Sequence, residues 1–187
     1  SPGGGALDRL QQDMPEQYQV LAQGAAGSWR LVGLFNWGDC PASQSLSLRE
    51  LGFAAGQVIH VFDFWAQRIW QASGAELNFP EIPTHACRLL RLCTVEEGHP
   101  ALLGSTLHIT QGLELAAWQS AANRLEFSTL DLGRAVQGSL WLRLPHPPMR
   151  VLCNLELVAP VDLGGGVYRL DVNFTGQARL VVDFQPV

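Results

Sequence analysis

The chain has 187 residues, 47% of them hydrophobic, with 12 basic and 17 acidic side chains and a formal net charge of −5. This length and apolar content suffice for one sizeable β domain or two small ones, and they exclude a disordered chain. A pI near 5.4 and the lack of a basic cluster argue against nucleic acid as a partner. No apolar run approaches the roughly 20 residues of a membrane helix, so no membrane partner is expected.

The first 27 residues are predicted to be a linker, because they are rich in glycine at the start and have only a weak apolar pattern. Alternation at Tyr18, Val20 and Ala22 predicts an edge strand near the end of this segment. Residues 1–10 lack the charged and apolar regions of a signal peptide, which favours the cytoplasm.

Two strands with apolar side chains on both faces are expected next. The first runs from Leu31 to Trp37, and the second, from Val58 to Trp65, repeats the pattern. Between them we expect a turn over 38–44 and a strand carrying Leu46, Leu48 and Leu51. A strand that is apolar on both faces is covered on both sides, by an opposing sheet and by something else. We expect that second cover to lie outside this chain.

Asp63 interrupts the second of these strands, between Phe62 and Phe64. A carboxylate in such surroundings is costly to bury unpaired. Asp63 is therefore expected to accept hydrogen bonds from backbone N–H groups or to meet an arginine, and Arg68 is the predicted local partner. Both residues are assigned a structural role.

The remaining chain is predicted to be β-structure throughout. Strands are expected over 84–93, 102–110 and 113–118, and regular alternation predicts half-exposed strands over 139–144, 150–157, 168–174 and 178–184. About ten strands at this spacing favour an all-β antiparallel sandwich with Greek-key connections. The change of pattern after Trp118 places a domain boundary near 118–123, which separates 28–118 from 119–187. A single continuous sandwich is the alternative.

No metal or cofactor is predicted. The candidate ligands are His85, Cys87, Cys93, His99 and His108. Zinc sites bring their ligands in close pairs, whereas here only His85 and Cys87 are close, on one strand face. These side chains are expected to pack. The four cysteines, Cys40, Cys87, Cys93 and Cys153, show no CxxC pairing and are expected to be reduced thiols, most of them buried.

Six tryptophans could offer flat faces to a sugar ring, although aromatic rings also build sandwich cores. Trp37, Trp65 and Trp118 lie among apolar neighbours, which favours the core or an interface. Trp70 and Trp141 have polar neighbours and are the candidates for carbohydrate binding, with packing as the competing interpretation.

Three phrases carry a resemblance to a known family: WRLVGLFNWGD at 29–39, VIHVFDFWAQRIW at 58–70, and IPTHACRLLRLC at 82–93 followed by LLGSTLHITQG. In this order they resemble the β-sandwich that follows the catalytic barrel in α-galactosidase-like (melibiase-type) glycoside hydrolases. The resemblance covers 18–118. It implies a non-catalytic accessory domain that braces a (β/α)8 barrel absent from this chain, with Phe64, Trp65 and His108 near the contact.

Catalysis is not expected of the chain itself. Glycoside hydrolysis needs two carboxyl groups across a sugar ring, and in the family that the chain resembles both are Asp residues of the barrel. This sequence has no eightfold βα pattern and therefore no place for them. Asp39 and Asp63 are interpreted as a turn residue and a buried acceptor. The alternative function is an autonomous carbohydrate-binding module, and a self-contained enzyme ranks third.

Overall fold

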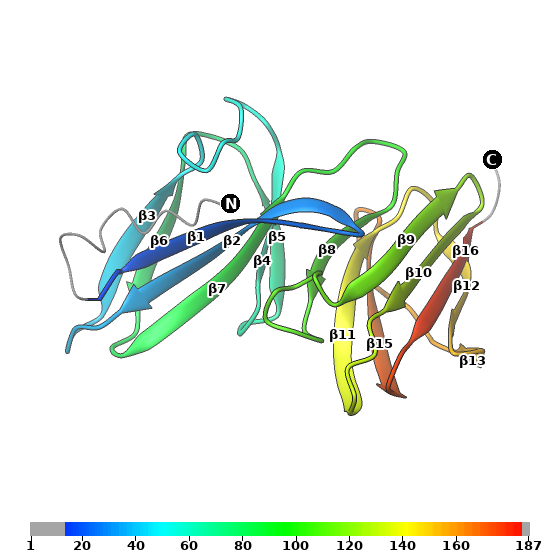
Figure 1. The fold of residues 1–187 in the computed structure, drawn as a ribbon. Helices are drawn as coiled ribbons and strands as arrows, with labels where there is room; N and C mark the ends of the chain where they lie inside the picture. Colours follow the sequence, from blue (N-terminus) through cyan, green and yellow to red (C-terminus); the bar gives the residue numbers. More distant parts are fainter. Residues whose placement is uncertain (1–13, 185–187) are drawn as a thin grey trace. The chain divides into compact units, whose positions relative to one another are not determined.

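A computed structural model describes residues 14–184, which form sixteen β-strands and no helix. The all-β prediction is thereby confirmed. The chain divides into two compact units (Figure 1). The first contains Ser28–Thr94 and the described residues up to Ala22, and the second contains Gln23–Gly27 and the described residues from Val95 onward. The described residues hold no helix of the length and apolarity that crossing a membrane requires.

The first unit pairs a five-stranded sheet with a two-stranded one (Figure 1). The larger sheet has the order β1-β2-β7-β4-β5, and β1 lies at its edge, where the edge strand was expected. Its strands are β1 (Gln17–Gly24), β2 (Gly27–Asn36), β4 (Ile59–Asp63), β5 (Arg68–Ala72) and β7 (Ala86–Cys93). The smaller sheet joins β3 (Ala42–Ser47) to β6 (Glu76–Ile82).

The core of the first unit lies between these two sheets. Val32 and Leu34 of β2 and Leu90 of β7 are almost fully buried and pack with Leu46 and Phe79 from β3 and β6. Successive side chains of a strand point to opposite faces, so these positions give the larger sheet one face that is entirely core. Burying each such side chain contributes roughly 1.5–3 kcal/mol.

A buried asparagine fixes the end of β2. The side-chain nitrogen of Asn36 lies 2.9 Å from the carbonyl oxygens of Cys40 and Ile82 and 3.0 Å from that of Pro83. Its side-chain oxygen accepts a hydrogen bond of 3.0 Å from the Gly38 N–H. One side chain therefore ties backbone groups after β2 to the end of β6 and the loop that follows it.

Replacing this asparagine should destabilise the first unit. We expect Asn36→Ala to lower the free energy of unfolding by about 2 kcal/mol, because the buried carbonyls lose their donor. Urea denaturation measures the difference. The matched control is Asn78→Ala, at an exposed position of β6. Equal stability of the two variants would contradict the proposed role of Asn36.

The second unit is a sandwich of two antiparallel sheets (Figure 1). One has the order β13-β12-β16-β10-β9, and the other the order β14-β15-β11-β8. The strands of the first sheet are β9 (Leu115–Ala121), β10 (Arg124–Thr129), β12 (Pro148–Cys153), β13 (Glu156–Leu157) and β16 (Arg179–Phe184). Those of the second are β8 (Ala101–Ser105), β11 (Ala135–Arg143), β14 (Val161–Asp162) and β15 (Val167–Thr175). Strand β16 lies between β10 and β12, a crossover of the kind expected for Greek-key connections.

The alternation predicted for this part of the chain is confirmed by burial over 168–174 and 178–184. It is wrong over 139–144, where Trp141 is buried, and over 150–157, where a turn at Asn154 leaves Leu155 and Leu157 exposed. Leu170 and Val172 of β15 and Leu180 and Val182 of β16 are buried, and their neighbours along each strand face outward. The buried set packs with Phe127 of β10 into one core. The five-stranded sheet of this unit therefore has one apolar and one polar face, whereas the other sheet also buries Leu103 and Trp141 on the face opposite to this core.

The division between the units differs from the boundary expected near 118–123. It falls between Thr94 and Val95, so β8 and β9 belong to the second unit. The physical reason is strand pairing: β8 pairs with β11, and β9 pairs with β10. Composition changes along the chain at Trp118, but hydrogen bonding between distant strands decides which segments share a core.

Several strands differ from the prediction. Strands β5, β6 and β10 were not expected, and β6 includes Pro80 in a segment predicted to be a loop. The strand expected through Trp65 ends at Asp63, because a turn with Gln67 at a positive φ of 48° follows. The strand expected through Leu51 ends at Ser47. Short strands with exposed side chains carry little periodic signal.

Candidate functional site

The outer face of the large sheet in the first unit is partly exposed at Phe35 and Leu89, whereas Phe62 and Arg91 on the same face are buried. Strand pairing sets Phe35 opposite Cys87 and Gly33 opposite Leu89, and these side chains point away from the core that Leu34 and Leu90 enter. Phe35 and Leu89 are only half-buried. The face thus carries apolar side chains that β3 and β6 do not cover.

Two stacked rings form one end of this face. The rings of Phe35 and Trp37 are parallel, with centroids 5.2 Å apart, and Trp37 is 44% exposed. The indole N–H of Trp37 donates a hydrogen bond of 3.0 Å to the Pro15 carbonyl. A Cβ on Gly33 would lie 2.8 Å from the Phe35 ring, so only glycine leaves room for this ring position. The rings are therefore held in place although they face solvent.

The turn after β4 presents two more aromatic rings. Oδ1 of Asp63 accepts hydrogen bonds from the backbone N–H groups of Trp65 (3.2 Å) and Ala66 (3.1 Å). Phe64 and Trp65 meet edge to face at 4.8 Å, and Trp65 is 59% exposed. The Phe64 N–H donates to the Leu89 carbonyl at 2.9 Å, so this turn adjoins the outer face of β7.

The arginine that meets Asp63 is Arg88 rather than the predicted Arg68. Asp63 is buried, and its Oδ2 accepts a hydrogen bond of 2.9 Å from Arg88. Arg88 lies on β7 two residues from Leu90, the backbone partner of Asp63, and its guanidinium lies 5.7 Å from the ring centre of Phe79. Arg68 is the residue opposite Asp63 on β5, but its side chain is exposed. The cation–π contact with the Phe79 ring stabilises the Arg88 guanidinium, which favours Arg88 over Arg68.

Removing the Arg88 guanidinium should therefore cost more than removing that of Arg68. We expect Arg88→Met to destabilise the chain by roughly 2 kcal/mol, because the buried Asp63 carboxylate loses a charged donor. Arg68→Met is expected to stay within about 0.5 kcal/mol of the parent. Urea denaturation of both variants checks the order, and a larger loss for Arg68→Met would show that the assignment is wrong.

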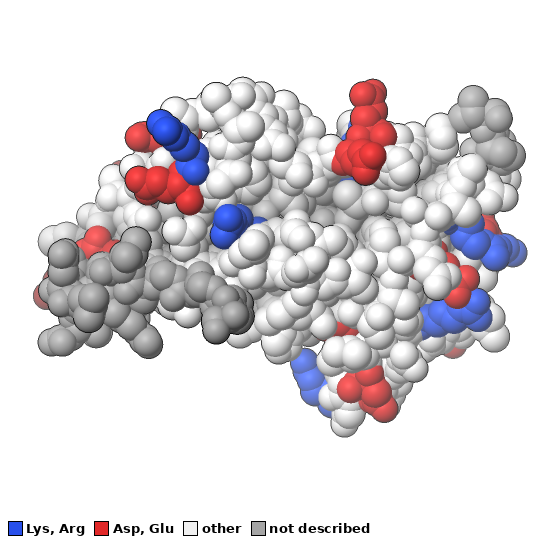
Figure 2. All heavy atoms as spheres, turned by 45° about the horizontal axis from the view of Figure 1, so that its top comes forward, with Lys and Arg blue, Asp and Glu red and all other residues white. Residues whose placement is uncertain are grey.

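In the second unit, the outer face of the five-stranded sheet is polar. Asp183 of β16 accepts hydrogen bonds from Arg124 (2.7 Å) and from Arg150 (2.6 and 2.8 Å), on the strands either side. The hydrogen bond from Arg124 is the largest cause that lowers the pKa of Asp183 below its usual value, and that from Arg150 adds to it, while burial opposes both. Figure 2 shows acidic and basic side chains grouped together on the face that it draws, with wide uncharged areas between the groups.

This lowered pKa makes part of the stability depend on pH. A carboxyl whose pKa is lower in the folded state adds stability that is fully present above the unfolded pKa, about 3.9, and is lost as the pH falls through the folded pKa. We expect wild type to exceed Asp183→Asn in unfolding free energy at about pH 6, and the difference to shrink below about pH 4. Urea denaturation at the two pH values measures it, and a difference that does not change with pH would contradict the prediction.

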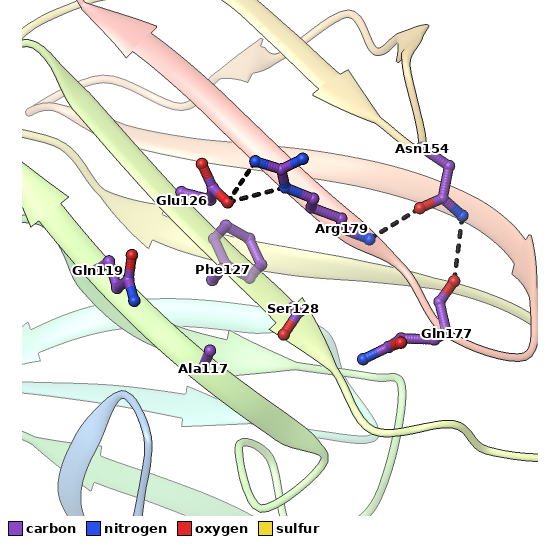
Figure 3. Close-up of a pocket in the computed structure, with 8 residues that line it drawn as sticks. All are labelled: Ala117, Gln119, Glu126, Phe127, Ser128, Asn154, Gln177 and Arg179. Carbon is purple, nitrogen blue, oxygen red and sulfur yellow. Dashed lines mark hydrogen bonds and ion pairs between the residues drawn. The ribbon is translucent and has the colours of Figure 1, made fainter.

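A hollow of about 320 Å³, with a lining that is about equally polar and apolar, lies on the same outer face of the second unit. Its lining residues are Ala117, Gln119, Glu126, Phe127, Ser128, Asn154, Gln177 and Arg179 (Figure 3). Small side chains form the floor, because Ala117 pairs with Ser128 and Ser128 pairs with Arg179. A β-bulge in β9 adjoins this floor, since Ser128 faces Ala117 but Thr129 faces Leu115.

Residues 15–92 match the family of alpha galactosidase C-terminal beta sandwich domains. The match runs from just before β1 to Leu92 in β7, and therefore falls on the first unit. It includes the outer face with Phe35, Trp37 and Trp65. The second unit, apart from Gln23–Gly27, lies outside the part matched to the alpha galactosidase C-terminal domain, and so do all residues that line the hollow.

Two solved structures of glycoside hydrolases are similar over most of the chain. The enzyme BuGH86 in complex with neoagarooctaose is 12% identical, with a TM-score of 0.29, over 93% of this chain and 32% of its own. A β-porphyranase of glycoside hydrolase family 86 from the human gut bacterium Bacteroides plebeius is 15% identical, with a TM-score of 0.25, over 94% and 35%. The chain thus spans about a third of the length of these structures. No curated protein matches the chain.

The two tryptophans predicted to bind sugar, Trp70 and Trp141, differ in how far they are buried. Trp141 is 2% exposed, so the expectation of an exposed ring there is wrong: it lies on β11 in a run of buried residues. Trp70 is half-buried, and its ring meets Phe79 at 6.4 Å on the core side of the sheet. Trp37 and Trp65, which were expected in the core or at an interface, are exposed.

The predicted interface residues divide between the units. Phe64 and Trp65 adjoin the outer face of the first unit, as described above. His108 belongs to the second unit; it is exposed, with its Nδ1 2.9 Å from the Thr110 hydroxyl.

The candidate metal ligands have other partners. His85 lies 3.2 Å from Asp39, and His99 lies 3.8 Å from Glu96. No group of three or more His, Cys, Asp or Glu side chains within residues 14–184 is arranged to hold a metal ion. None of the four cysteines forms a disulfide; Cys93 and Cys153 are buried, whereas Cys40 and Cys87 are exposed. Burial raises the pKa of the Cys93 thiol, which keeps it protonated.

Sequence reasoning missed Glu114, a buried carboxylate in the second unit. It accepts hydrogen bonds from the Ser105 hydroxyl and, at 2.7 Å, from the Gly112 N–H. These contacts hold the loop between β8 and β9, in which Gln111 has a positive φ of 54°. The role is structural, and the only signal in the sequence was an acidic residue between two leucines.

Proposed function

We propose that this chain is the non-catalytic C-terminal β-sandwich region of an α-galactosidase-like glycoside hydrolase, and that its first unit braces a (β/α)8 barrel elsewhere in the same polypeptide. The family match over 15–92 supports the proposal. The observation that carries it physically is the partly exposed apolar face of the first unit, which lies within the matched residues.

This docking face consists of Phe35, Trp37, Phe64, Trp65 and Leu89. Pairing of Phe35 with Cys87, and the hydrogen bond from Phe64 to Leu89, make it continuous across β2, β7 and the turn after β4. Soluble proteins rarely leave a contiguous apolar patch without a partner. The rings are already ordered by stacking, by the indole hydrogen bond of Trp37 and by the turn that Asp63 caps. Ordered side chains lose little conformational entropy on docking, which favours a permanent contact.

The chain has no catalytic role in this proposal. Hydrolysis of a glycosidic bond needs one carboxyl to donate a proton and another to act as nucleophile or base. Asp63 is buried with its oxygens occupied by Arg88 and two backbone N–H groups, and Asp39 lies on an exposed turn beside His85. Both carboxylates are thus accounted for by structural contacts, and the reaction belongs to the barrel.

The first test is the mass of the native polypeptide, detected in the source cell with an antibody against this chain. A product larger by at least roughly 250 residues, the size of a barrel, is expected. A product close to the 20.4 kDa of this chain would overturn the proposal.

A second test uses substitutions in that native polypeptide. We expect Trp65→Ser combined with Leu89→Ser to lower its unfolding free energy by roughly 1–3 kcal/mol, because an apolar contact with the barrel is lost. The control is Leu157→Ser, at a position that is 78% exposed in the second unit and outside the docking face. Thermal unfolding and hydrolysis of an aryl α-galactoside are the measurements. Equal effects of the control and the double variant would argue against docking at this face.

The competing function, an autonomous carbohydrate-binding module, loses its predicted site at the buried Trp141. The hollow of the second unit is a different candidate place for a saccharide.

A further inference from the structure

We infer that the hollow on the outer face of β9, β10 and β16 binds a neutral oligosaccharide. The site is in the second unit and uses none of the residues of the docking face. The inference therefore does not depend on the barrel, and either proposal can fail without the other.

The walls of the hollow are held by contacts among themselves (Figure 3). Nε and Nη2 of Arg179 both lie 2.7 Å from Oε1 of Glu126. Asn154 accepts a hydrogen bond of 2.8 Å from the Arg179 N–H and donates one of 3.1 Å to the Gln177 carbonyl. Gln177 in turn donates 2.9 Å to the Thr129 carbonyl. Binding groups in such a network lose little freedom when a ligand arrives.

Asn154 owes its position to the turn between β12 and β13. Its φ is 48°, in the left-handed region that asparagine tolerates better than most residues. This conformation directs both ends of the amide group toward the start of β16, where Gln177 and Arg179 lie. The turn thus supplies one wall of the hollow.

Several polar atoms in the hollow have no partner among residues 14–184. Oε2 of Glu126 and Oε1 of Gln177 are acceptors, the Ser128 hydroxyl can donate and accept, and the Gln119 amide offers both functions. A hydroxyl group of a sugar also donates and accepts at once. Adjacent sugar hydroxyls can therefore pair with these neighbouring acceptors and donors. A hydrogen bond to the Glu126 carboxylate is stronger than one to a neutral amide or hydroxyl.

The charge and size of the hollow favour a neutral ligand. One carboxylate, Glu126, and one guanidinium, Arg179, line it and neutralise each other, and the free carboxylate oxygen would repel an anion. The volume of about 320 Å³ lies within the range of small-molecule sites, about 300 to 1,000 Å³. The lining is about equally polar and apolar, and Ala117 and Phe127 are its apolar residues.

No tryptophan stacks on the ligand in this site. Trp118 pairs with Phe127 and their rings lie 5.1 Å apart toward the core, away from the hollow. Binding therefore rests on hydrogen bonds, which replace bonds to water and give a modest net gain each. We expect dissociation constants in the millimolar range.

The experiment is an NMR titration of the whole chain labelled with ¹⁵N. The neutral probes are melibiose, maltotriose and xylotriose, and digalacturonate is the charged comparison. We expect at least one neutral probe to shift the side-chain amide signals of Gln119, Asn154 and Gln177. Ser128→Phe, which fills the floor, should weaken that binding by at least about tenfold. Ala121→Phe, on the same outer face of β9 but outside the lining, should leave it unchanged.

Each other result overturns the inference. It fails if none of the neutral probes shifts these amide signals, if binding survives Ser128→Phe, or if digalacturonate binds more tightly than the neutral probes. Should Ser128→Phe not fold, Gln119→Ala on the exposed edge strand takes its place. The affinity of Gln119→Ala for the neutral probe is expected to fall several-fold while the variant stays folded. Unchanged affinity would again count against the site.

Discussion

The large sheet of the first unit packs Val32, Leu34 and Leu90 against β3 and β6 and leaves Phe35 and Leu89 half exposed on its other face. A sheet in a soluble protein ordinarily has one apolar and one solvated face. A second apolar face costs free energy while water covers it, and this cost supports the proposed contact with a barrel. The stacked rings, the Asn36 contacts at the end of β2 and the Asp63 turn all serve to hold this face in one conformation.

Two buried polar side chains of the first unit act at the ends of strands. Asn36 satisfies loop carbonyls where β2 ends, and Asp63 caps the turn where β4 ends. Each hydrogen bond of this kind contributes little to the free energy of folding. A buried polar group that is left without its hydrogen bond lowers stability by more. They fix where each strand stops, and thereby which aromatic side chains reach the outer face.

The second unit covers its apolar side chains differently from the first. Its two sheets bury Leu170 and Val182 in one core, and its five-stranded sheet presents charged and amide side chains on the outer face. On one outer face, Asp183 joins Arg124 to Arg150, and Glu126 joins Arg179 across the hollow. A polar face of this kind needs no protein cover and leaves small, hydrated recesses in which a hydroxyl-rich ligand can replace water.

The sequence by itself determined the all-β class, the two-faced strands of the first unit, the alternating strands of the second and the need of Asp63 for a partner, because side-chain periodicity and the cost of burying a charge act locally. Only the tertiary structure decided that Arg88 rather than Arg68 meets Asp63, that Trp141 is buried while Trp65 is exposed, and that β8 and β9 belong to the second unit. These outcomes depend on which distant strands pair and where each strand ends. The hollow likewise joins Gln119 to Asn154 and Arg179, residues far apart in the chain that only the sheet order β12-β16-β10-β9 brings together.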